Sequence, residues 1–284
     1  MKKKRLPIII LAVLGTLLFL SIYNALGFQA QPAQIHNETA VAELATSQIT
    51  RSDESGEEQT FEESVQMTED DHGRAEEYDH PIHLTFDDGP NAATPAILNE
   101  LKKYDYKATF FMLEPQMKQY PDLVKRIVNE GHAVGLHGVT HVVDTFYGSE
   151  EVALQEMLDT QDTLFDLTGV KSTLVRTPYG SIPYFTDSFR ALFDKHELKL
   201  WDWNVDSEDW KGGDFLNNVT TQMKKVEDNG QTPTIVMHDK EGTADQLSDL
   251  LNYLSKNEYT PVKIYEDDKP INFKCNDRCS RRNE

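Results

Sequence analysis

The chain has 284 residues, of which 38% are hydrophobic, and this is enough for one globular domain with a real core. Its formal net charge of −20 argues against nucleic acid or anionic lipid as a partner, because either would repel an acidic surface. The two cysteines, Cys275 and Cys279, exclude a disulfide framework and a cysteine-rich zinc site, and they form either one small local disulfide or two free thiols.

The N-terminal residues have the pattern of a membrane segment. A basic cluster at residues 2–5 precedes an apolar run over residues 6–23, close to the roughly 20 residues that a spanning helix needs. We therefore expect residues 1–28 to be a single-pass anchor in the cell membrane, with a basic cytoplasmic end and the rest of the chain outside. A cleaved signal peptide is the alternative, because small residues near 25–30 suit a peptidase, and the protein would then be secreted.

Residues 29–79 are rich in Gln, Glu, Ser, Thr and Asp. Between His36 and His80 the chain carries 14 acidic residues against Arg51 and Arg74. Like charges repel one another and extend the chain, so we expect an acidic disordered stalk, or a solvated linker with no further role.

Beyond the stalk, short apolar runs alternate with helical patterns, which predicts parallel βαβ units. About seven strands in roughly 185 residues are too few for a complete barrel of about 250 residues. We therefore expect an α/β fold of the distorted or incomplete (β/α) barrel type over residues 80–265, followed by a charged tail over residues 266–284. An open doubly wound sheet is the alternative, but no glycine-rich phosphate fingerprint follows any strand.

The expected strands cover residues 82–86, 108–112, 133–136, 173–176, 199–203, 234–237 and 261–264. The expected helices cover residues 94–104, 120–130, 149–167, 187–196, 214–229 and 244–256.

Two adjacent carboxylates, Asp87 and Asp88, end the first expected strand, where Gly89-Pro90 turns the backbone. The carboxyl ends of parallel strands are where α/β folds build their sites. At such an end the two side chains can diverge, one towards a metal and one towards a substrate, although an ordinary surface turn has the same sequence.

His137 and His141 follow the third expected strand, in a glycine-containing loop. A loop can bring two imidazoles onto one ion, and together with Asp88 they would form a set of two histidines and one aspartate. Zinc accepts three such ligands and keeps a position open for water. Taken alone, two histidines four residues apart are more often incidental.

Three further segments lie at expected strand ends. Arg176 begins a Pro-Tyr-Gly turn, Asp206 begins a segment of acids that ends at Trp210, and His238 ends an apolar strand. Each has an ordinary structural explanation by itself, as a surface turn, packed aromatics or a buried histidine. Their occurrence in order at successive strand ends is the stronger signal.

Together the five segments resemble the polysaccharide deacetylase family, also called the NodB-homology domain or carbohydrate esterase family 4, and within it the membrane-anchored peptidoglycan deacetylases. The family signature is TFDDGP, H(S/T)xxH, RxPYG, DxxDW and LxH. In this chain it corresponds to Thr85 to Pro90, His137 to His141, Arg176 to Gly180, Asp206 to Trp210, and Val236 to His238.

The resemblance implies a metal centre and a general base. Asp88, His137 and His141 would bind Zn²⁺, or another divalent ion such as Co²⁺ or Mn²⁺. The ion would polarise water and the substrate amide, and Asp87 would be the base that completes deprotonation of the water.

The resemblance also assigns the remaining roles. The backbone N–H of Tyr179 would stabilise the oxyanion, and His238 would protonate the leaving amine with Asp206 as its partner. Arg176 would orient Asp87. Trp210 and Val236 would form the wall of the acetyl pocket.

Two residues depart from the family pattern. Gly138 replaces a serine or threonine, so a hydroxyl that would help to hold the histidine loop is absent. Val236 replaces a leucine and removes apolar bulk where the acetyl methyl would lie. Neither change removes a ligand or a proton carrier.

We therefore expect a monomeric metal-dependent hydrolase that removes acetyl groups from N-acetylglucosamine in peptidoglycan and releases acetate. Chitin oligomers, an exopolysaccharide or O-acetyl xylan are alternative substrates. A catalytically silent glycan-binding protein is the alternative from another class. A metalloprotease is disfavoured, because such enzymes place a glutamate after the first histidine, where this chain has Gly138.

Overall fold

The computed structural model describes residues 78–276 and 278–280. The expected anchor at residues 1–28 and nearly all of the expected stalk lie outside these residues. Among the helices that the structure describes, none has the length and apolar content to cross a bilayer.

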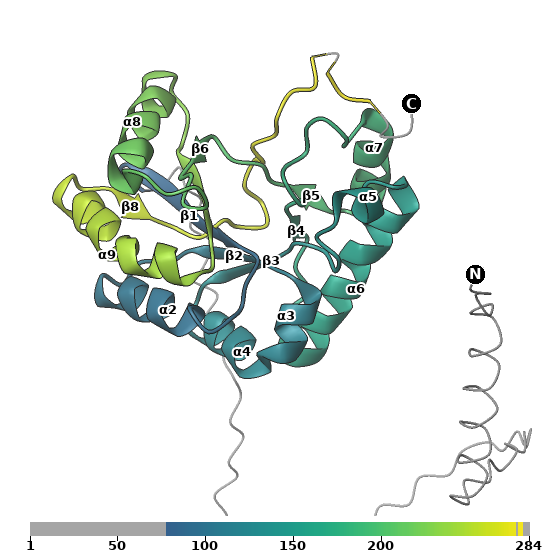
Figure 1. Cartoon of the computed structure of the whole chain (residues 1–284), viewed down its shortest axis with the longest axis horizontal. Helices are drawn as coiled ribbons and strands as arrows, with labels where there is room; N and C mark the ends of the chain where they lie inside the picture. Colours follow the sequence, from purple (N-terminus) through teal and green to yellow (C-terminus); the bar gives the residue numbers. More distant parts are fainter. Residues whose placement is uncertain (1–77, 277, 281–284) are drawn as a thin grey trace, which may run out of the picture. The chain divides into compact units, whose positions relative to one another are not determined.

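A parallel sheet forms the centre of the described domain (Figure 1). Seven strands follow one path in the order β5-β4-β3-β2-β1-β7-β6, and β8 pairs with β1 off this path. The path ends at β5 and β6, so the curled sheet is an incomplete barrel, as the sequence predicts. The strands are β1 (Pro81–Asp87), β2 (Thr109–Met112), β3 (Ala133–Leu136), β4 (Leu174–Val175), β5 (Lys199–Leu200), β6 (Val205–Asp206), β7 (Thr234–His238) and β8 (Thr260–Pro261).

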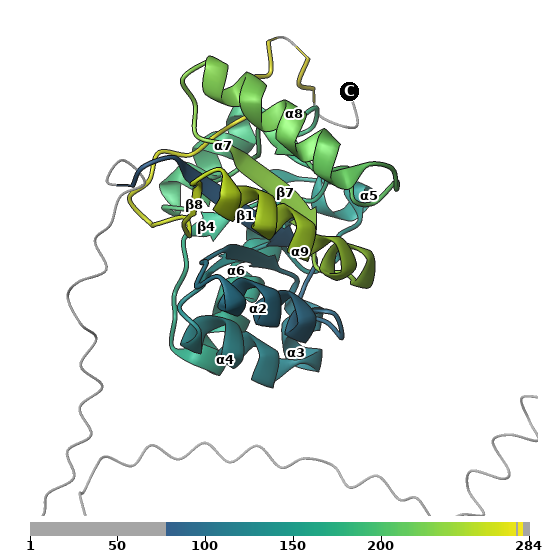
Figure 2. The same cartoon turned by 90° about the vertical axis from the view of Figure 1, so that its left-hand side faces the viewer.

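Helices cover the outer side of the sheet, as the two views at right angles show (Figures 1 and 2). The six expected helices are confirmed to within three residues at each end, and two short helices, α3 and α5, were not predicted. The helices are α2 (Thr94–Lys103), α3 (Glu114–Gln119), α4 (Pro121–Asn129), α5 (Val143–Phe146), α6 (Glu150–Thr168), α7 (Asp187–Lys195), α8 (Phe215–Asp228) and α9 (Glu241–Lys256).

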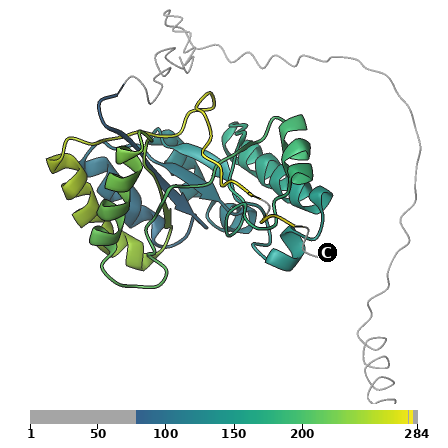
Figure 3. The same ribbon diagram turned by 90° about the horizontal axis from the view of Figure 1, so that it is seen from above.

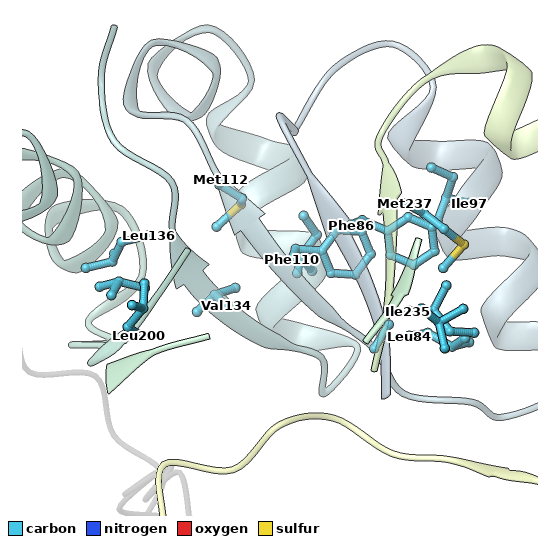
Figure 4. Close-up of a cluster of buried hydrophobic side chains, with 14 of the residues drawn as sticks. Leu84, Phe86, Ile97, Phe110, Met112, Val134, Leu136, Leu200, Ile235 and Met237 are labelled. Atoms are coloured by element: carbon cyan, nitrogen blue, oxygen red, sulfur yellow. The ribbon is translucent and has the colours of Figure 1, made fainter. Parts of the chain in front are cut away.

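The central strand β1 separates the apolar core from the site. Leu84 and Phe86 are fully buried in the main hydrophobic cluster (Figure 4), where the ring of Phe86 stacks on Phe110 of β2 at 5.1 Å. Successive side chains of a strand point to opposite faces, so Thr85 and Asp87 point to the inside of the curled sheet. There both accept hydrogen bonds from Arg176. Alternation in β1 therefore directs apolar side chains to the helices and polar ones to the interior.

The strands at the edge of the sheet are shorter than the sequence predicts. The expected strand at 199–203 ends at Leu200, because the backbone N–H of Asp202 donates to Ile271 of the C-terminal segment instead of to a neighbouring strand. The expected strands at 173–176 and 261–264 shorten to two residues each, and β6 was not predicted separately.

Residues after β8 cross to the side of α7, where they pack on the domain (Figure 3). Arg190 of α7 donates to the side chain of Asn272 at 2.9 Å, and the Phe273 ring lies edge-on to Trp203 at 5.0 Å. Cys275 and Cys279 form a disulfide. The charged tail thus contributes structure to the domain at least as far as this bond.

Candidate active site

A cavity of about 570 Å³ opens at the carboxyl ends of the central strands. β1 and β7 bring two expected site residues together, because their register pairs Asp87 with His238. Of the ten residues predicted for the site, nine line this cavity, and Arg176 lies buried behind Asp87. The lining residues are Asp87, Asp88, His137, His141, Tyr179, Trp203, Asp206, Trp210, Val236, His238, Asp239 and Lys240.

The adjacent carboxylates of Asp87 and Asp88 diverge where β1 ends. Asp88 has a left-handed backbone conformation, with φ 71°, which turns the chain out of the strand. The Asp87 carboxylate meets the guanidinium of Arg176, whereas Asp88 Oδ1 lies near two imidazoles. One backbone turn therefore separates the two carboxylates into different chemical environments.

Asp88, His137 and His141 form a cluster that suits a divalent metal ion. Asp88 Oδ1 lies 3.4 Å from His137 Nε2 and 3.3 Å from His141 Nε2, and the three ligand atoms lie within 4.8 Å of one another. Tetrahedral zinc ligands at about 2 Å from the ion are separated by roughly 3.3 Å, so the first two distances match a shared ion. This is the only cluster of its kind that the described residues contain.

Two further observations fit a metal centre. Asp88 Oδ1 is buried and has no hydrogen-bond partner, although a buried carboxylate oxygen normally has one. His137 Nδ1 lies 2.7 Å from the carbonyl oxygen of Arg176, to which it can donate, and this leaves the lone pair of Nε2 directed at the cluster. The donor set of one carboxylate and two imidazoles is one that zinc accepts.

The charges of the cluster are mutually dependent. Burial alone would raise the pKa of Asp88, but the imidazoles of His137 and His141 hold it well below its usual range. Burial lowers the pKa of His137, yet the carboxylates of Asp87 and Asp88 outweigh this effect and raise it. Burial and the neighbouring His137 together lower the pKa of His141. A cation at this position is thus electrostatically favoured by the carboxylates.

Arg176 fixes the orientation of Asp87 from the interior of the sheet. Its Nη1 donates to Asp87 Oδ1 at 2.9 Å and to the Thr85 hydroxyl at 2.6 Å, while Nε donates to the carbonyl of Trp201 at 3.1 Å. The guanidinium lies 4.2 Å over the Phe111 ring and is fully buried. Asp87 Oδ2 points towards the metal cluster, 4.0 Å from His137 Nε2.

His238 has a different carboxylate partner from the one that the sequence predicted. Its Nδ1 lies 2.7 Å from Asp209 Oδ1, and its backbone N–H donates to Asp209 Oδ2 at 2.8 Å. The prediction of Asp206 as partner was wrong, because the Asp206 carboxylate instead accepts the backbone N–H of Glu208 at 2.9 Å. Glu208 has φ 53°, and this turn returns Asp209 to the strand end.

The Asp209 pair alters both pKa values. Burial would lower the pKa of His238, but the hydrogen bond to Asp209 and the charges of Asp87 and Asp209 outweigh burial and raise it. Burial would raise the pKa of Asp209, but His238 holds it below its ordinary value. Thr243 of α9 donates a further hydrogen bond to the same carboxylate. The imidazolium form of His238 is therefore favoured.

Aromatic side chains form the rim of the cavity. Tyr179 and Trp210 are 62% and 61% exposed, which is unusual for large aromatic side chains and leaves their faces available to a ligand. Tyr179 has φ 63° and its ring lies 4.6 Å from that of His141. Val236 of β7 lies deeper, almost fully buried.

Sequence reasoning missed three residues that line the cavity: Trp203, Lys240 and Asp239. Asp239 is 2% exposed, burial raises its pKa to about 6, and its Oδ2 accepts the Thr94 hydroxyl at 2.7 Å. A side chain at Gly89 would collide with this carboxylate, which explains the glycine there. The position of Asp239 directly after His238 was the available signal.

Known proteins are similar to this chain in sequence. The family described as polysaccharide deacetylase matches residues 74–201. The chain is 38% identical over 166 residues to a peptidoglycan-N-acetylglucosamine deacetylase of Bacillus cereus, over 55% of this chain and 59% of that protein. It is 40% identical over 185 residues to the peptidoglycan-N-acetylmuramic acid deacetylase PdaC of Bacillus subtilis, over 64% of this chain and 38% of that protein.

A solved structure is similar over its whole length. The polysaccharide deacetylase Bc1974 from Bacillus cereus matches with a TM-score of 0.61 and 35% identity, over 70% of this chain and 100% of that chain. The two relatives identified by sequence are matched over less than two thirds of their own length.

Proposed function

The chain belongs to the polysaccharide deacetylase family, and we propose that it hydrolyses the N-acetyl groups of N-acetylglucosamine residues in peptidoglycan, releasing acetate and a free amine. The observation that carries this proposal is the convergence of three parts on one cavity. These are the Asp88–His137–His141 cluster, the Asp87 carboxylate beside it, and the imidazole of His238, which pairs with Asp209.

The metal centre would consist of Asp88, His137 and His141, with zinc as the ion we propose. When bound, a divalent ion supplies Lewis acidity, which polarises an amide carbonyl and lowers the pKa of a water molecule. The buried Asp88 Oδ1 without a hydrogen-bond partner supports this assignment.

Asp87 is the proposed general base. Its Oδ1 is held by Arg176 at 2.9 Å, and this leaves Oδ2 to accept a proton from water at the cavity. Because the guanidinium stays charged at all relevant pH values, it holds the Asp87 carboxylate in one orientation. Accepting a proton within hydrogen-bond reach is the geometric requirement for a base, and Asp87 lines the cavity where such a water would lie.

His238 is the proposed general acid. Asp209 accepts from its Nδ1 and favours the imidazolium form, in which Nε2 also carries a proton that can pass to the leaving amine. The backbone N–H of Tyr179 is proposed to donate to the oxyanion of the tetrahedral intermediate. Trp210 and Val236 would enclose the acetyl methyl, and the exposed rings of Tyr179 and Trp210 would contact the sugar.

The proposed substrate follows from the relatives and from the sequence of the N-terminal segment. Two sequence relatives are named as peptidoglycan deacetylases, one for N-acetylglucosamine and one for N-acetylmuramic acid. We propose the first, with the catalytic domain acting as a monomer outside the cell and residues 1–28 as a membrane anchor. The Cys275–Cys279 disulfide supports an oxidising compartment.

The experiment measures acetate and amine release by the purified full-length protein, metal-stripped and zinc-restored. The substrates are peptidoglycan, N-acetylglucosamine oligomers and an N-acetylated peptide. Zinc-dependent acetate release from the glycans and none from the peptide is the expected result. Zinc binding without release from any glycan would contradict the proposed reaction and favour a glycan-binding protein. Cleavage of the peptide would indicate a protease.

A further inference from the structure

We propose that Glu156 of α6 is a positioning residue that fixes the histidine loop, residues 137–141, and thereby sets the affinity of the protein for its divalent ion. The inference rests on the metal centre proposed above. Glu156 is neither a member of the ligand cluster nor a lining residue of the cavity. It would therefore act through the loop and not on the ion.

The Glu156 carboxylate makes three hydrogen bonds to the segment between the two histidines. Oε2 accepts the backbone N–H groups of Val139 and Thr140, each at 2.9 Å, and Oε1 accepts the Thr140 hydroxyl at 2.7 Å. Hydrogen bonds to an ionised acceptor are stronger than neutral ones. Because Val139 and Thr140 lie directly before His141, a shift of these two residues would move the His141 imidazole.

Gly138 allows the loop to approach Glu156. It has φ 90°, a conformation that residues with a side chain rarely adopt. A Cβ at this position would lie 3.2 Å from Glu156 Oε2 and 3.4 Å from the Phe146 ring. Gly138 lacks the hydroxyl of the family pattern, but it lets the loop lie close to the Glu156 carboxylate. This carboxylate then holds the loop in place of the missing hydroxyl.

Glu156 is itself held rigidly. α6 begins at a capping residue, since the Ser149 side chain accepts the N–H of Val152, and ends at Gly169 in the left-handed conformation. The helix packs against α3, α4 and α5, and the Glu156 side chain is 6% exposed. A carboxylate on a packed helix can impose its position on a loop that carries ligands.

The loop is also anchored by the backbone at the same place. The N–H of Glu114, at the start of α3, donates to the Gly138 carbonyl at 3.0 Å. The backbone N–H of His137 donates to the carbonyl of Met112 at 2.9 Å. These bonds fix the first half of the loop, so removal of Glu156 is expected to release chiefly the second half, which carries His141.

The test measures the zinc dissociation constant of the metal-stripped full-length protein by competition with a chromophoric chelator. Glu156→Ala removes all three hydrogen bonds and is expected to weaken zinc binding by about 10- to 100-fold, as is usual when residues that orient metal ligands are lost. Thr140→Val removes the hydroxyl bond to Glu156 and the long one that this hydroxyl accepts from the Val142 N–H at 3.4 Å. It keeps both backbone bonds to Glu156 and is expected to weaken binding less than Glu156→Ala. Glu156→Gln keeps one acceptor oxygen for the two N–H groups and is expected to lie between wild type and Glu156→Ala.

Gln161 provides a matched control on the same helix. It is also 6% exposed, and its amide donates to the Ser172 carbonyl at 2.7 Å, away from the histidine loop. Gln161→Ala is expected to lower the melting temperature but to leave the zinc dissociation constant unchanged. Deacetylation by Glu156→Ala is expected to recover at saturating zinc, whereas no zinc concentration should restore an Asp88→Asn variant.

The outcomes separate this inference from the proposed function. A folded Glu156→Ala variant that binds zinc as tightly as wild type would overturn the inference while leaving the metal centre intact. Equal weakening in Glu156→Ala and Gln161→Ala would show a general structural role and would also overturn it. Failure of the wild-type protein to bind zinc would overturn both proposals.

Discussion

Two buried carboxylates in and beside the candidate site, Asp87 and Asp209, differ in the cation nearest to each. Asp87 pairs with the guanidinium of Arg176, whose charge does not change with pH, at 2.9 Å. Asp209 pairs with the imidazole of His238 at 2.7 Å, and this cation can lose its proton, while the Lys240 ammonium lies farther from the same oxygen, at 3.6 Å. Arg176 stays charged, so Asp87 keeps the same partner and can accept a proton through its other oxygen. The imidazolium of His238 can release its proton, so the His238–Asp209 pair can act as a proton donor. The difference between the partners thus assigns base and acid.

The largest expected effect comes from removing the base. Asp87→Asn keeps the shape of the side chain and its contact with Arg176 but cannot accept a proton. We expect kcat to fall by about 10³-fold, within the range that general base catalysis contributes. The measurement is acetate release at saturating substrate and zinc. Retention of more than a tenth of the wild-type kcat would contradict the assignment of Asp87.

Removing Arg176, the permanent cation beside Asp87, is expected to lower the stability of the protein strongly. Arg176→Met leaves Asp87 buried without its partner, and breaking a buried ion pair from one side costs about 3–5 kcal/mol of unfolding free energy. Urea unfolding of the metal-stripped protein measures this loss. Arg126 is the control, since its pair with Glu130 at 2.8 Å is partly exposed, and Arg126→Met should cost under about 1 kcal/mol. Similar losses of unfolding free energy in both variants would show that the buried Arg176–Asp87 pair matters no more than the partly exposed Arg126–Glu130 pair.

Removing Asp209, the partner of His238, is expected to move the alkaline limb of the pH–activity profile. Asp209 raises the pKa of His238, so the acid form persists to a higher pH than in an ordinary histidine. Asp209→Asn removes this hydrogen bond and this charge, so the pKa of His238 should fall below its wild-type value. The alkaline limb of the kcat/KM profile should therefore move to lower pH, with a loss of about 10- to 100-fold near the optimum. An unmoved limb would show that His238 is not the proton donor. The same measurement on Asp206→Asn should show no shift.

The smallest effect is expected at a residue that belongs to neither pair. Val236→Leu restores the apolar bulk of the family pattern at the wall of the cavity. We expect kcat/KM to change by less than about tenfold through KM, with the pH profile unmoved, because one methylene in a pocket alters binding only modestly. Steady-state kinetics over a pH series measures both quantities. A shifted pH limb would mean that the wall residues influence the proton donor, and it would weaken the comparison between the two pairs.

The sequence predicts those parts of the fold and site that depend on local pattern. The apolar run before Asp87 ends at a turn, so the position of Asp87 and Asp88 at the end of β1 could be predicted, and the structure agrees. His137 and His141 follow β3 for the same reason. In each case the polarity pattern and the glycine or proline signals coincide at one strand end, and the parallel sheet then brings these ends together.

The sequence does not determine which of several similar side chains a turn directs inwards. Asp206 and Asp209 are both acids in one segment, and the choice between them depends on the left-handed conformation of Glu208, which no local pattern specifies. Glu156 is one of several acids in α6, and only the packing of this helix beside the histidine loop distinguishes it. Tertiary contacts decide both cases.

The measurement that tests the account most directly determines zinc content and acetate release together in Asp87→Asn and Asp88→Asn variants of the full-length protein. The account predicts that Asp87→Asn binds one equivalent of zinc and releases almost no acetate from peptidoglycan, while Asp88→Asn loses both zinc and activity. Loss of zinc in Asp87→Asn, or full activity in Asp88→Asn, would contradict the division of the two adjacent carboxylates into base and ligand.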